Sequence, residues 1–351
     1  MQVFECVSRH KYTYPGLLDA LVLHSYNAAA LIPPLPRPVT SVVDLIGNTP
    51  MLQLTRIPTA CDAAIFAKLE FLNPGGSVKD RIGIGMIRSA ERDGRIKPGG
   101  TIIEPTAGNT GIGLALAGVR LGYKVVLCVP DNFSMEKQEV MRALGGDVVV
   151  TPGDDGIRGA IQKAEELAAS TPNSYVCQQF RNPYNSEAHY ATTAPEIWEQ
   201  MDGEIDAFVC GSGSGGTFTG VARYLKERNP KLYAVIVEPQ GSVLQGGEPG
   251  PHEVEGIGSS FIPPALDMSL ADEVMMIRDP EAFAMVARLA AEEGVLGGSS
   301  SGANVAAALH VAGRLGAGKR VVTLIPDAAE RYMSKGIFSN WKKRVPADPA
   351  D

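Results

Sequence analysis

Asn73-Pro74-Gly75-Gly76-Ser77-Val78-Lys79-Asp80-Arg81 carries the strongest local signal in this chain. It follows a short apolar strand predicted at 65–69, and its turn residues place Lys79 at the start of a helix predicted at 78–93. A helix N-terminus disfavours a nearby ammonium, which favours the neutral, nucleophilic amine that a Schiff-base lysine needs. The alternative is an ordinary exposed lysine after a turn, because most lysines are solvated. Other motifs must decide between the two.

A second motif, Glu104-Pro-Thr106-Ala107-Gly108-Asn109-Thr110-Gly111, also lies between a predicted strand and a predicted helix, the latter at 109–122. The free backbone N–H groups of a helix start, helped by Thr and Asn side chains, can hold an anion such as a carboxylate. The alternative is a glycine-rich turn with an N-cap. We expect a clamp for a substrate carboxylate here.

A third motif, Gly211-Ser-Gly213-Ser214-Gly215-Gly216-Thr217, precedes a helix predicted at 216–228, and its glycines allow close approach of a phosphate. A Walker loop is excluded because no Lys-Ser/Thr pair follows the glycines. Gly211, Gly213, Gly216 and Glu238 also satisfy a dinucleotide fingerprint, but that interpretation leaves Lys79 and Asn109 without a role. A phosphate-bearing cofactor that bonds to a lysine uses all three motifs.

Weaker signals come from the helix start Gly297-Gly-Ser-Ser300-Ser-Gly302 and from two loop segments, 178–183 and 256–258. From the residues alone, the helix start is best interpreted as a simple N-cap, and the loops could line a cleft. The five histidines form no metal-binding spacing, so we expect no metal site and interpret each histidine as structural.

The composition describes an ordinary globular protein: 351 residues, 44% hydrophobic and 20% charged, with a net charge of -7. The negative charge argues against a nucleic-acid partner. Five scattered cysteines suggest neither a disulfide framework nor a zinc site and favour a cytoplasmic setting. The most apolar stretch, 17–31, is interrupted by Asp19 and His24, so we expect no membrane span and interpret it as part of an N-terminal extension rather than a signal peptide.

The organisation of the chain predicts an α/β fold with two open, mostly parallel sheets and a cofactor cleft between them, because apolar strands alternate with amphipathic helices. We expect an extension with a Pro-rich linker at 1–40, an N-terminal domain at 41–185 carrying Lys79, and a C-terminal domain at 186–345 carrying the phosphate loop. Strands are expected at 65–69, 101–103, 124–129, 147–150, 207–210, 233–237 and 320–325. Further helices are expected at 134–145, 155–169, 186–201, 280–293, 301–315 and 330–343.

Taken together, the motifs resemble the cysteine synthase and cystathionine β-synthase family of pyridoxal 5′-phosphate enzymes, the fold-type II (tryptophan synthase β-like) group. The resemblance runs from about residue 40 to about residue 340. Besides the stretches quoted above, it rests on Ile46-Gly-Asn-Thr-Pro50, Gly246-Gly-Glu-Pro-Gly-Pro-His252 and Glu255-Gly-Ile-Gly258.

The resemblance implies specific roles for the motif residues. Lys79 would form the Schiff base, Asn109 would bond the ring hydroxyl of the cofactor, and Ser300 would meet the pyridine nitrogen. The phosphate would rest on Gly213, Ser214, Gly215, Gly216 and Thr217. The substrate and its carboxylate would be surrounded by Thr106, Ala107, Gly108, Thr110, Gln179 and Gly256.

The activity implied is β-replacement through an α-aminoacrylate, giving L-cysteine from O-acetyl-L-serine and sulfide in a homodimeric enzyme. A neutral hydroxyl at the pyridine nitrogen makes the ring a weaker electron sink, which suits prompt loss of a β-leaving group. Alternatives are condensation with homocysteine, use of O-phosphoserine, or a non-catalytic binding protein. Most relatives carry serine where this chain has Ala107, and Ser259-Ser260 matches neither subfamily. The resemblance implies neither haem nor a regulatory domain.

Overall fold

The computed structural model describes residues 38–59, 62–106 and 108–338. The extension and most of the Pro-rich linker, together with Ala107, lie outside the described residues. Contacts within the chain separate residues 1–40 from residues 41–351. The further division at residue 185 stays a prediction.

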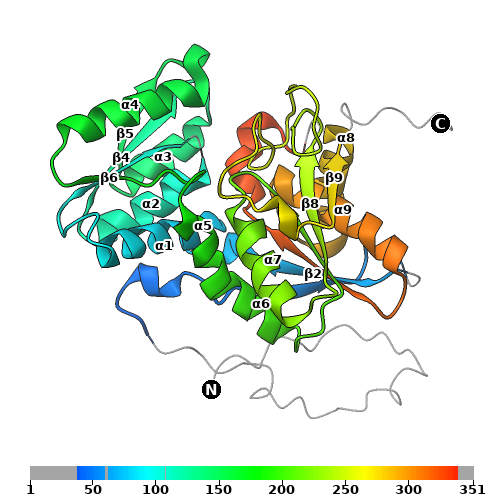
Figure 1. The fold of residues 1–351 in the computed structure, drawn as a ribbon. Helices are drawn as coiled ribbons and strands as arrows, with labels where there is room; N and C mark the ends of the chain where they lie inside the picture. The colour runs from blue at the N-terminus through cyan, green and yellow to red at the C-terminus, as the bar shows by residue number, and fades with distance from the viewer. Residues whose placement is uncertain (1–37, 60–61, 107, 339–351) are drawn as a thin grey trace, which may run out of the picture. The chain divides into compact units, whose positions relative to one another are not determined.

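Two sheets form the framework (Figure 1). The larger sheet has the order β1 (Met51–Leu54), β2 (Ala64–Leu69), β10 (Arg320–Ile325), β7 (Ala207–Gly211), β8 (Tyr233–Pro239), β9 (Glu273–Ile277). The smaller has the order β5 (Asp147–Thr151), β4 (Lys124–Pro130), β3 (Thr101–Pro105), β6 (Ser174–Val176). β1 pairs antiparallel with β2, and the other pairs in these sheets are parallel. The predicted α/β fold is therefore confirmed, and β1 and β2 join the sheet built otherwise from the second half of the chain.

The helices begin close to the positions that the sequence predicts. They are α1 (Lys79–Arg92), α2 (Asn109–Arg120), α3 (Met135–Ala143), α4 (Gly156–Ser170), α5 (Pro183–Ala188), α6 (Ala194–Gln200), α7 (Gly216–Arg228), α8 (Asp279–Glu293) and α9 (Ser299–Leu315). A π-helical segment, η5 (His189–Thr193), joins α5 to α6. Short 3₁₀ segments are η2 (Val42–Leu45), η3 (Glu70–Leu72), η4 (Gly153–Asp155), η6 (Met268–Leu270) and η7 (Ala329–Lys335).

Two kinds of local prediction were wrong. The helix predicted at 330–343 is the 3₁₀ segment η7 up to Lys335, and its last residues lie outside the described part of the chain. Residues of the first turn of η7 make hydrogen bonds outside the segment: Ala329 N–H donates to Leu296 O, and Tyr332 donates its hydroxyl to Asp327. The strands β1, β6 and β9 were missed because they are only three to five residues long and lack a long β-branched run.

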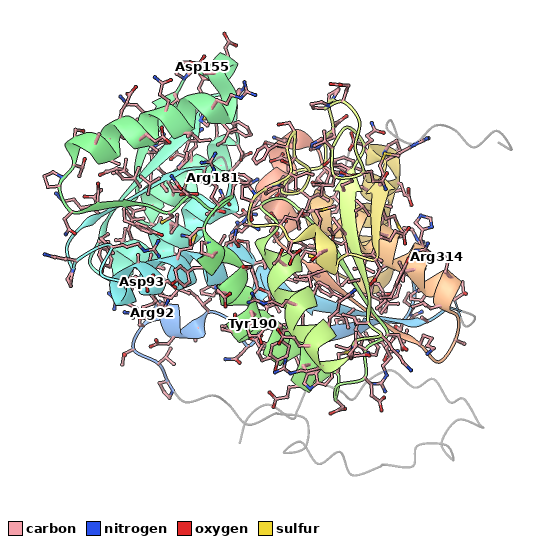
Figure 2. All side chains as sticks on the ribbon, viewed as in Figure 1. Arg92, Asp93, Asp155, Arg181, Tyr190 and Arg314 are labelled. Carbon is pink, nitrogen blue, oxygen red and sulfur yellow. The ribbon has the colours of Figure 1, made fainter. Side chains whose placement is uncertain are left out.

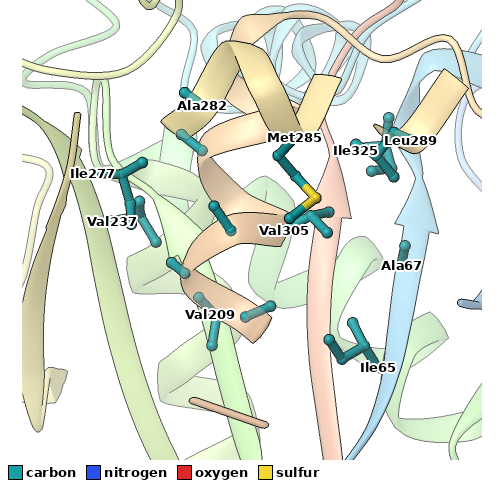
Figure 3. Close-up of a cluster of buried hydrophobic side chains, with 14 of the residues drawn as sticks. Ile65, Ala67, Val209, Val237, Ile277, Ala282, Met285, Leu289, Val305 and Ile325 are labelled. Carbon is teal, nitrogen blue, oxygen red and sulfur yellow. The ribbon is translucent and has the colours of Figure 1, made fainter. Parts of the chain in front are cut away.

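Each sheet is covered on both faces, as parallel sheets require. Side chains alternate along β7. Val209 belongs to the buried cluster that includes Met285 of α8 and Val305 of α9 (Figure 3), whereas Phe208 stacks with Phe218 of α7 on the other face. In the smaller sheet, Ile102 belongs to the cluster with α1 and α2 residues, and Ile103 to the cluster with α4 residues. These apolar layers fix the strand ends from which the motif turns emerge.

Charged side chains occupy the outer surfaces of the helices (Figure 2). Arg92 and Asp93 at the end of α1 form a solvent-exposed ion pair of 3.2 Å, and Arg314 near the end of α9 reaches Glu273 at 2.7 Å. None of the helices in the described ranges combines the length and the apolar character that a membrane crossing requires.

Candidate active site

A cavity of about 470 Å³ brings the sequence motifs together. Its lining includes Lys79, the turn before α2, the loop before α7 and Ser300 at the start of α9. This volume falls in the range of roughly 300–1,000 Å³ typical of small-molecule sites. Of the described residues predicted for the site, all line the cavity except Gly216: Lys79, Thr106, Gly108, Asn109, Thr110, Gln179, Gly213, Ser214, Gly215, Thr217, Gly256 and Ser300. Ala107 lies outside the described residues.

Lys79 begins α1, and the chain before it is fixed to the large sheet. Val78 N–H donates to Pro326 O at 2.8 Å, which holds the helix start beside the end of β10. Burial lowers the pKa of the Lys79 amine, although Cys210 and Asp327 oppose the shift. The Cys210 thiol lines the same cavity, and burial raises its pKa to about 12, so it stays protonated near neutral pH. Lys79 is thus an amine whose neutral form is favoured inside a cavity.

The turn before α2 presents its backbone to the cavity. A Cβ atom added at Gly108 would meet no other atom within 4 Å, so a ligand can approach this backbone closely. Thr110 donates its hydroxyl to Gln179 Oε1 at 2.7 Å, which leaves the amide N–H groups of Gln179 available as donors. Glu104 holds the loop that carries Gln179, because its carboxyl oxygens accept Gln178 N–H at 2.7 Å and Gln179 N–H at 3.1 Å.

The loop before α7 depends on its glycines. A Cβ atom at Gly213 would clash with Gly256 O, and Gly215 has a positive φ of 88° and packs against Leu266. Asn304 fixes the start of the loop by accepting Gly211 N–H at 2.8 Å. Since the first N–H groups of a helix have no intrahelical acceptor, the start of α7 offers donors for an anion.

The dinucleotide alternative fails at Glu238. Its carboxylate accepts the backbone N–H groups of Leu244 at 2.8 Å and Gln245 at 3.0 Å, and the residue is 1% exposed. A ribose hydroxyl could not reach it. Rejection of that fingerprint in favour of a lysine-bonded cofactor agrees with the geometry.

Asn109 is held by two residues that sequence reasoning missed. Its Nδ2 donates to Asp327 Oδ2 at 2.7 Å, and its Oδ1 accepts from Arg331. Tyr332 donates to the same Asp327 oxygen, and burial, together with Asp327, raises the tyrosine pKa well above its ordinary value. The second N–H of the Asn109 amide remains for a ligand. For Asp327, a signal was available in its position directly after the strand predicted at 320–325, at the edge where ligands bind in such sheets.

A further pair of charged residues, also missed, lies on the cavity wall. Lys137 of α3 is 3.1 Å from Glu255, which itself lies 2.6 Å from Lys335. Burial alone would raise the pKa of Glu255, but Lys137 and Lys335 hold it below its ordinary value. Among the described residues, no group of three or more His, Cys, Asp or Glu could hold a metal ion.

Comparison of the sequence and the structure with known proteins identifies the family. A family model described as "Pyridoxal-phosphate dependent enzyme" matches residues 42–327. The chain belongs to this pyridoxal-phosphate-dependent enzyme family. One relative, the "O-acetylserine dependent cystathionine beta-synthase" of Bacillus subtilis, is 52% identical over 86% of this chain and 98% of its own. The "Cysteine synthase" of Helicobacter pylori strain J99 is also 52% identical, over 86% of this chain and 99% of its own.

Solved structures agree with the family assignment. The crystal structure of the O-acetylserine dependent cystathionine beta-synthase from Helicobacter pylori has a TM-score of 0.82 and 52% identity, and covers 86% of this chain and 100% of its own. The chain is therefore a pyridoxal-phosphate-dependent enzyme of the fold-type II class, as the sequence predicted.

The residues in the cavity fit this cofactor. An aldehyde-bearing ring needs an amine, its ring nitrogen needs a polar partner, and its phosphate needs N–H and O–H donors without a crowding Cβ. Lys79, the Ser300 hydroxyl and the Gly213–Thr217 loop lie around the cavity and would meet these three needs in that order.

Proposed function

We propose that this enzyme catalyses β-replacement that makes L-cysteine from O-acetyl-L-serine and sulfide. The observation that carries the proposal is that one cavity collects a lysine of lowered pKa and two helix starts, the turn before α2 and the glycine-rich loop before α7. We assign the substrate carboxylate to the first and the cofactor phosphate to the second. Relatives 46–52% identical over most of their own length, named as cysteine synthases, support the same reaction.

The cofactor-binding roles are part of this proposal. Gly213, Ser214, Gly215, Gly216 and Thr217 would hold the phosphate, and Lys79 would supply the amine. Ser300 would be the polar partner of the ring nitrogen, and Asn109 would donate to the ring hydroxyl. When bound, pyridoxal phosphate supplies a ring that stabilises negative charge at the substrate α-carbon. Ser300 is neutral, so it moderates this effect compared with a carboxylate partner.

Lys79 Nζ is the group that moves the α-proton. Its burial favours the neutral amine, which can accept a proton near neutral pH. The competing Cys210 thiol has a pKa of about 12 and cannot act as a base there. Its place on the first turn of α1 keeps the amine directed into the cavity.

The substrate carboxylate binds at the turn before α2. It is surrounded by Thr106, Gly108, Thr110 and Gln179. The side-chain amide hydrogens of Gln179 donate to the carboxylate, because the bond from Thr110 uses only the amide oxygen. Ala107, which lies outside the described residues, belongs to the same proposed group by its place in the motif. Gly256 lies next to Ser300, where a Cβ atom would come within 3.8 Å of the serine hydroxyl, and its lack of a side chain leaves room for the substrate.

Condensation with homocysteine, giving cystathionine, is the second candidate. Lys137 and Glu255 place opposite charges on the cavity wall, which would suit the carboxylate and ammonium of an amino-acid thiol. The Bacillus subtilis relative carries that activity in its name. O-phosphoserine is an alternative donor for either reaction.

The test combines spectra with a product assay. The purified enzyme should show the visible absorption of lysine-bound cofactor, and Lys79→Ala should abolish that covalent bond and lower turnover by more than about a thousandfold. O-acetylserine should change the spectrum, and sulfide should restore it with release of cysteine. Restoration by homocysteine alone would move the assignment to the second candidate. Retention of the lysine-bound absorption by Lys79→Ala would refute the proposal.

A homodimer in the cytoplasm completes the proposed setting. The dimer is supported by the resemblance of the sequence to its family and is measured by sedimentation or light scattering. The described cysteines Cys128, Cys177 and Cys210 are free and buried, which suits a reducing compartment.

A further inference from the structure

The helical segment from α5 through η5 to α6 packs against α7, the helix that follows the loop 211–217. Asn185 and His189 are four residues apart in this segment, so their side chains lie on the same face. π-helical turns occur frequently at functional sites. α7 approaches this face closely: a Cβ at Gly220 would clash with Ser186 O and come within 2.8 Å of the His189 Cβ. Both side chains thereby reach the loop.

Asn185 contacts one hydroxyl of the loop. Its Nδ2 donates to Ser214 Oγ at 2.9 Å and to Gln179 O at 2.8 Å, and the residue is 1% exposed. The amide thus uses its two hydrogens on two different loops. Because the Ser214 oxygen accepts from Asn185, the hydrogen of its hydroxyl must point elsewhere. Gly216 makes this approach possible, since a Cβ there would overlap the Asn185 side chain.

His189 contacts the other hydroxyl. Its Nε2 lies 3.1 Å from Thr217 Oγ1, its Nδ1 lies 2.8 Å from Thr193 Oγ1, and the residue is fully buried. Burial is the main cause that holds the pKa of the imidazole well below its ordinary value, and the neighbouring Arg81 guanidinium acts in the same direction. The ring is therefore neutral and has one N–H donor and one acceptor nitrogen.

The chemistry of a phosphate dianion selects one of the two tautomers. The dianion only accepts hydrogen bonds, so the Thr217 hydroxyl must donate to it, and its oxygen is then free to accept from His189 Nε2–H. Thr193 completes the chain by donating its hydroxyl to Nδ1. The loop 211–217 contains no lysine or arginine, so correctly aimed hydroxyls and amides must supply its affinity for the anion.

We propose that Asn185 and His189 are positioning residues for the cofactor: they occupy the oxygens of Ser214 and Thr217 so that both hydroxyls donate to the cofactor phosphate. This inference rests on the proposed phosphate site. It assigns a role to a histidine that we expected to be purely structural. It also links the phosphate loop to the Gln179 loop, because one Asn185 amide bonds both.

The experiment compares two ligands that differ only in the phosphate. The apo-enzyme, freed of cofactor, is titrated with pyridoxal phosphate and, separately, with pyridoxal, which lacks the phosphate. His189→Leu should weaken pyridoxal phosphate binding by about tenfold, because a hydrogen bond to a charged group is lost or misdirected. It should leave pyridoxal binding unchanged. His189→Gln, which retains an N–H donor, should restore most of the phosphate-dependent affinity.

A double-mutant cycle locates the effect at Thr217. Thr217→Val should weaken binding of pyridoxal phosphate, and adding His189→Leu to it should cost nothing more. The exposed His310 provides the matched control, because His310→Leu should change neither affinity. Nitrogen NMR of the wild-type imidazole should show the proton on Nε2. Circular dichroism of every variant checks that it folds.

The outcomes are distinguishable. A His189→Leu enzyme that loses affinity for pyridoxal and pyridoxal phosphate equally would show a merely structural role and overturn the inference. Additive losses in the double mutant, or a proton found on Nδ1, would also overturn it. If His189→Leu does not fold, the cycle is run with His189→Gln and Thr217→Ser instead. The proposal is then contradicted if either variant loses more affinity for pyridoxal phosphate than Thr217→Val does. A wild-type protein that binds no pyridoxal phosphate would instead reject the proposed function, and this inference with it.

Discussion

Lys137 Nζ lies 3.1 Å from Glu255 Oε2, and this ion pair joins α3, which packs beside the smaller sheet, to the loop that follows β8 of the larger sheet. Both residues line the cavity. The Lys137 side chain is 5% exposed, whereas that of Glu255 is 26% exposed. The pair therefore links two segments of the cavity wall that come from different sheets.

Lys137→Met should remove the ion pair with Glu255 while keeping an apolar side chain of similar length. We expect the free energy of unfolding to fall by about 1–2 kcal/mol, because a partly buried carboxylate loses one of its two lysine partners. The KM for the amino-acid donor should rise severalfold, measured by steady-state kinetics. As a control, Lys163→Met removes an exposed pair with Glu166 and should change stability by less than about 0.5 kcal/mol. Equal effects of the two substitutions would contradict the role of Lys137.

Asp80, next to Lys79, should make stability depend on pH. Burial raises its pKa to about 7, although Gly75 N–H donates to one carboxyl oxygen. A raised carboxyl pKa means that the folded state binds a proton more tightly than the unfolded chain. The contribution is fully present below pH about 3.8 and is lost as pH rises through about 7, a loss of up to roughly 4 kcal/mol.

Asp80→Asn tests this effect because the amide cannot ionise. The difference in unfolding free energy between wild type and Asp80→Asn, measured by denaturant titration, should shift in favour of the variant from pH 4 to pH 8. A difference that stays constant over this range would show that Asp80 is ionised in the folded protein at both ends.

Gly213→Ala should damage the proposed phosphate loop at 213–217. The new methyl group would clash with Gly256 O, which is backbone and cannot move aside freely. We expect a loss of about 1–3 kcal/mol in stability and at least a tenfold loss in cofactor affinity. Thermal melts and cofactor titration measure both.

Gly313→Ala provides the matched control for that substitution. Gly313 lies in α9, and its added Cβ would meet only Asp62 at an ordinary contact distance of 3.4 Å. Alanine is the better helix former, so this variant should be equally stable or more stable by about 0.5–1 kcal/mol. If Gly313→Ala lowers stability as much as Gly213→Ala does, the close contact at Gly213 does not explain the loss.

Glu196 should contribute strongly to the stability of the fold but not to the binding of the cofactor. Its carboxylate binds Arg81 at 2.7 Å and Lys68 at 2.8 Å, and Lys68 is fully buried. Burial alone would raise its pKa, but Arg81 and Lys68 lower it to about 2. The ionised carboxylate thus stabilises the fold above pH about 4.5, and this contribution is lost as pH falls through about 2.

Glu196→Gln should lower the unfolding free energy by about 3–5 kcal/mol, since two buried cations lose their shared partner. Urea denaturation at neutral pH measures the loss, with the exposed Glu166→Gln as control. The spectrum of the bound cofactor should not change in the folded variant. A change there would mean that the network reaches the active site through Arg81.

The sequence was sufficient to find those segments of the cavity lining that carry a local pattern. Lys79, the turn at Thr106–Thr110 and the loop at Gly213–Thr217 each lie between an apolar strand and a helix start, and glycines, capping residues and strand patterns are visible within about ten residues. The same local rules gave the α/β fold and most element positions. They missed β1, β6 and β9, and gave a regular helix where η7 is found, because short segments take their conformation from neighbours in space.

Long-range pairing decided the rest. β2 lies between β1 and β10 in one sheet, which sets Lys79 beside Asp327 although 248 residues separate them in the chain. The partners of Asn109, Ser214 and Thr217, namely Asp327, Asn185 and His189, carry no local pattern that marks them. Their roles come from hydrogen bonds between segments distant in sequence, and such contacts exist only once the apolar faces of both sheets are buried and the strand ends are fixed in space.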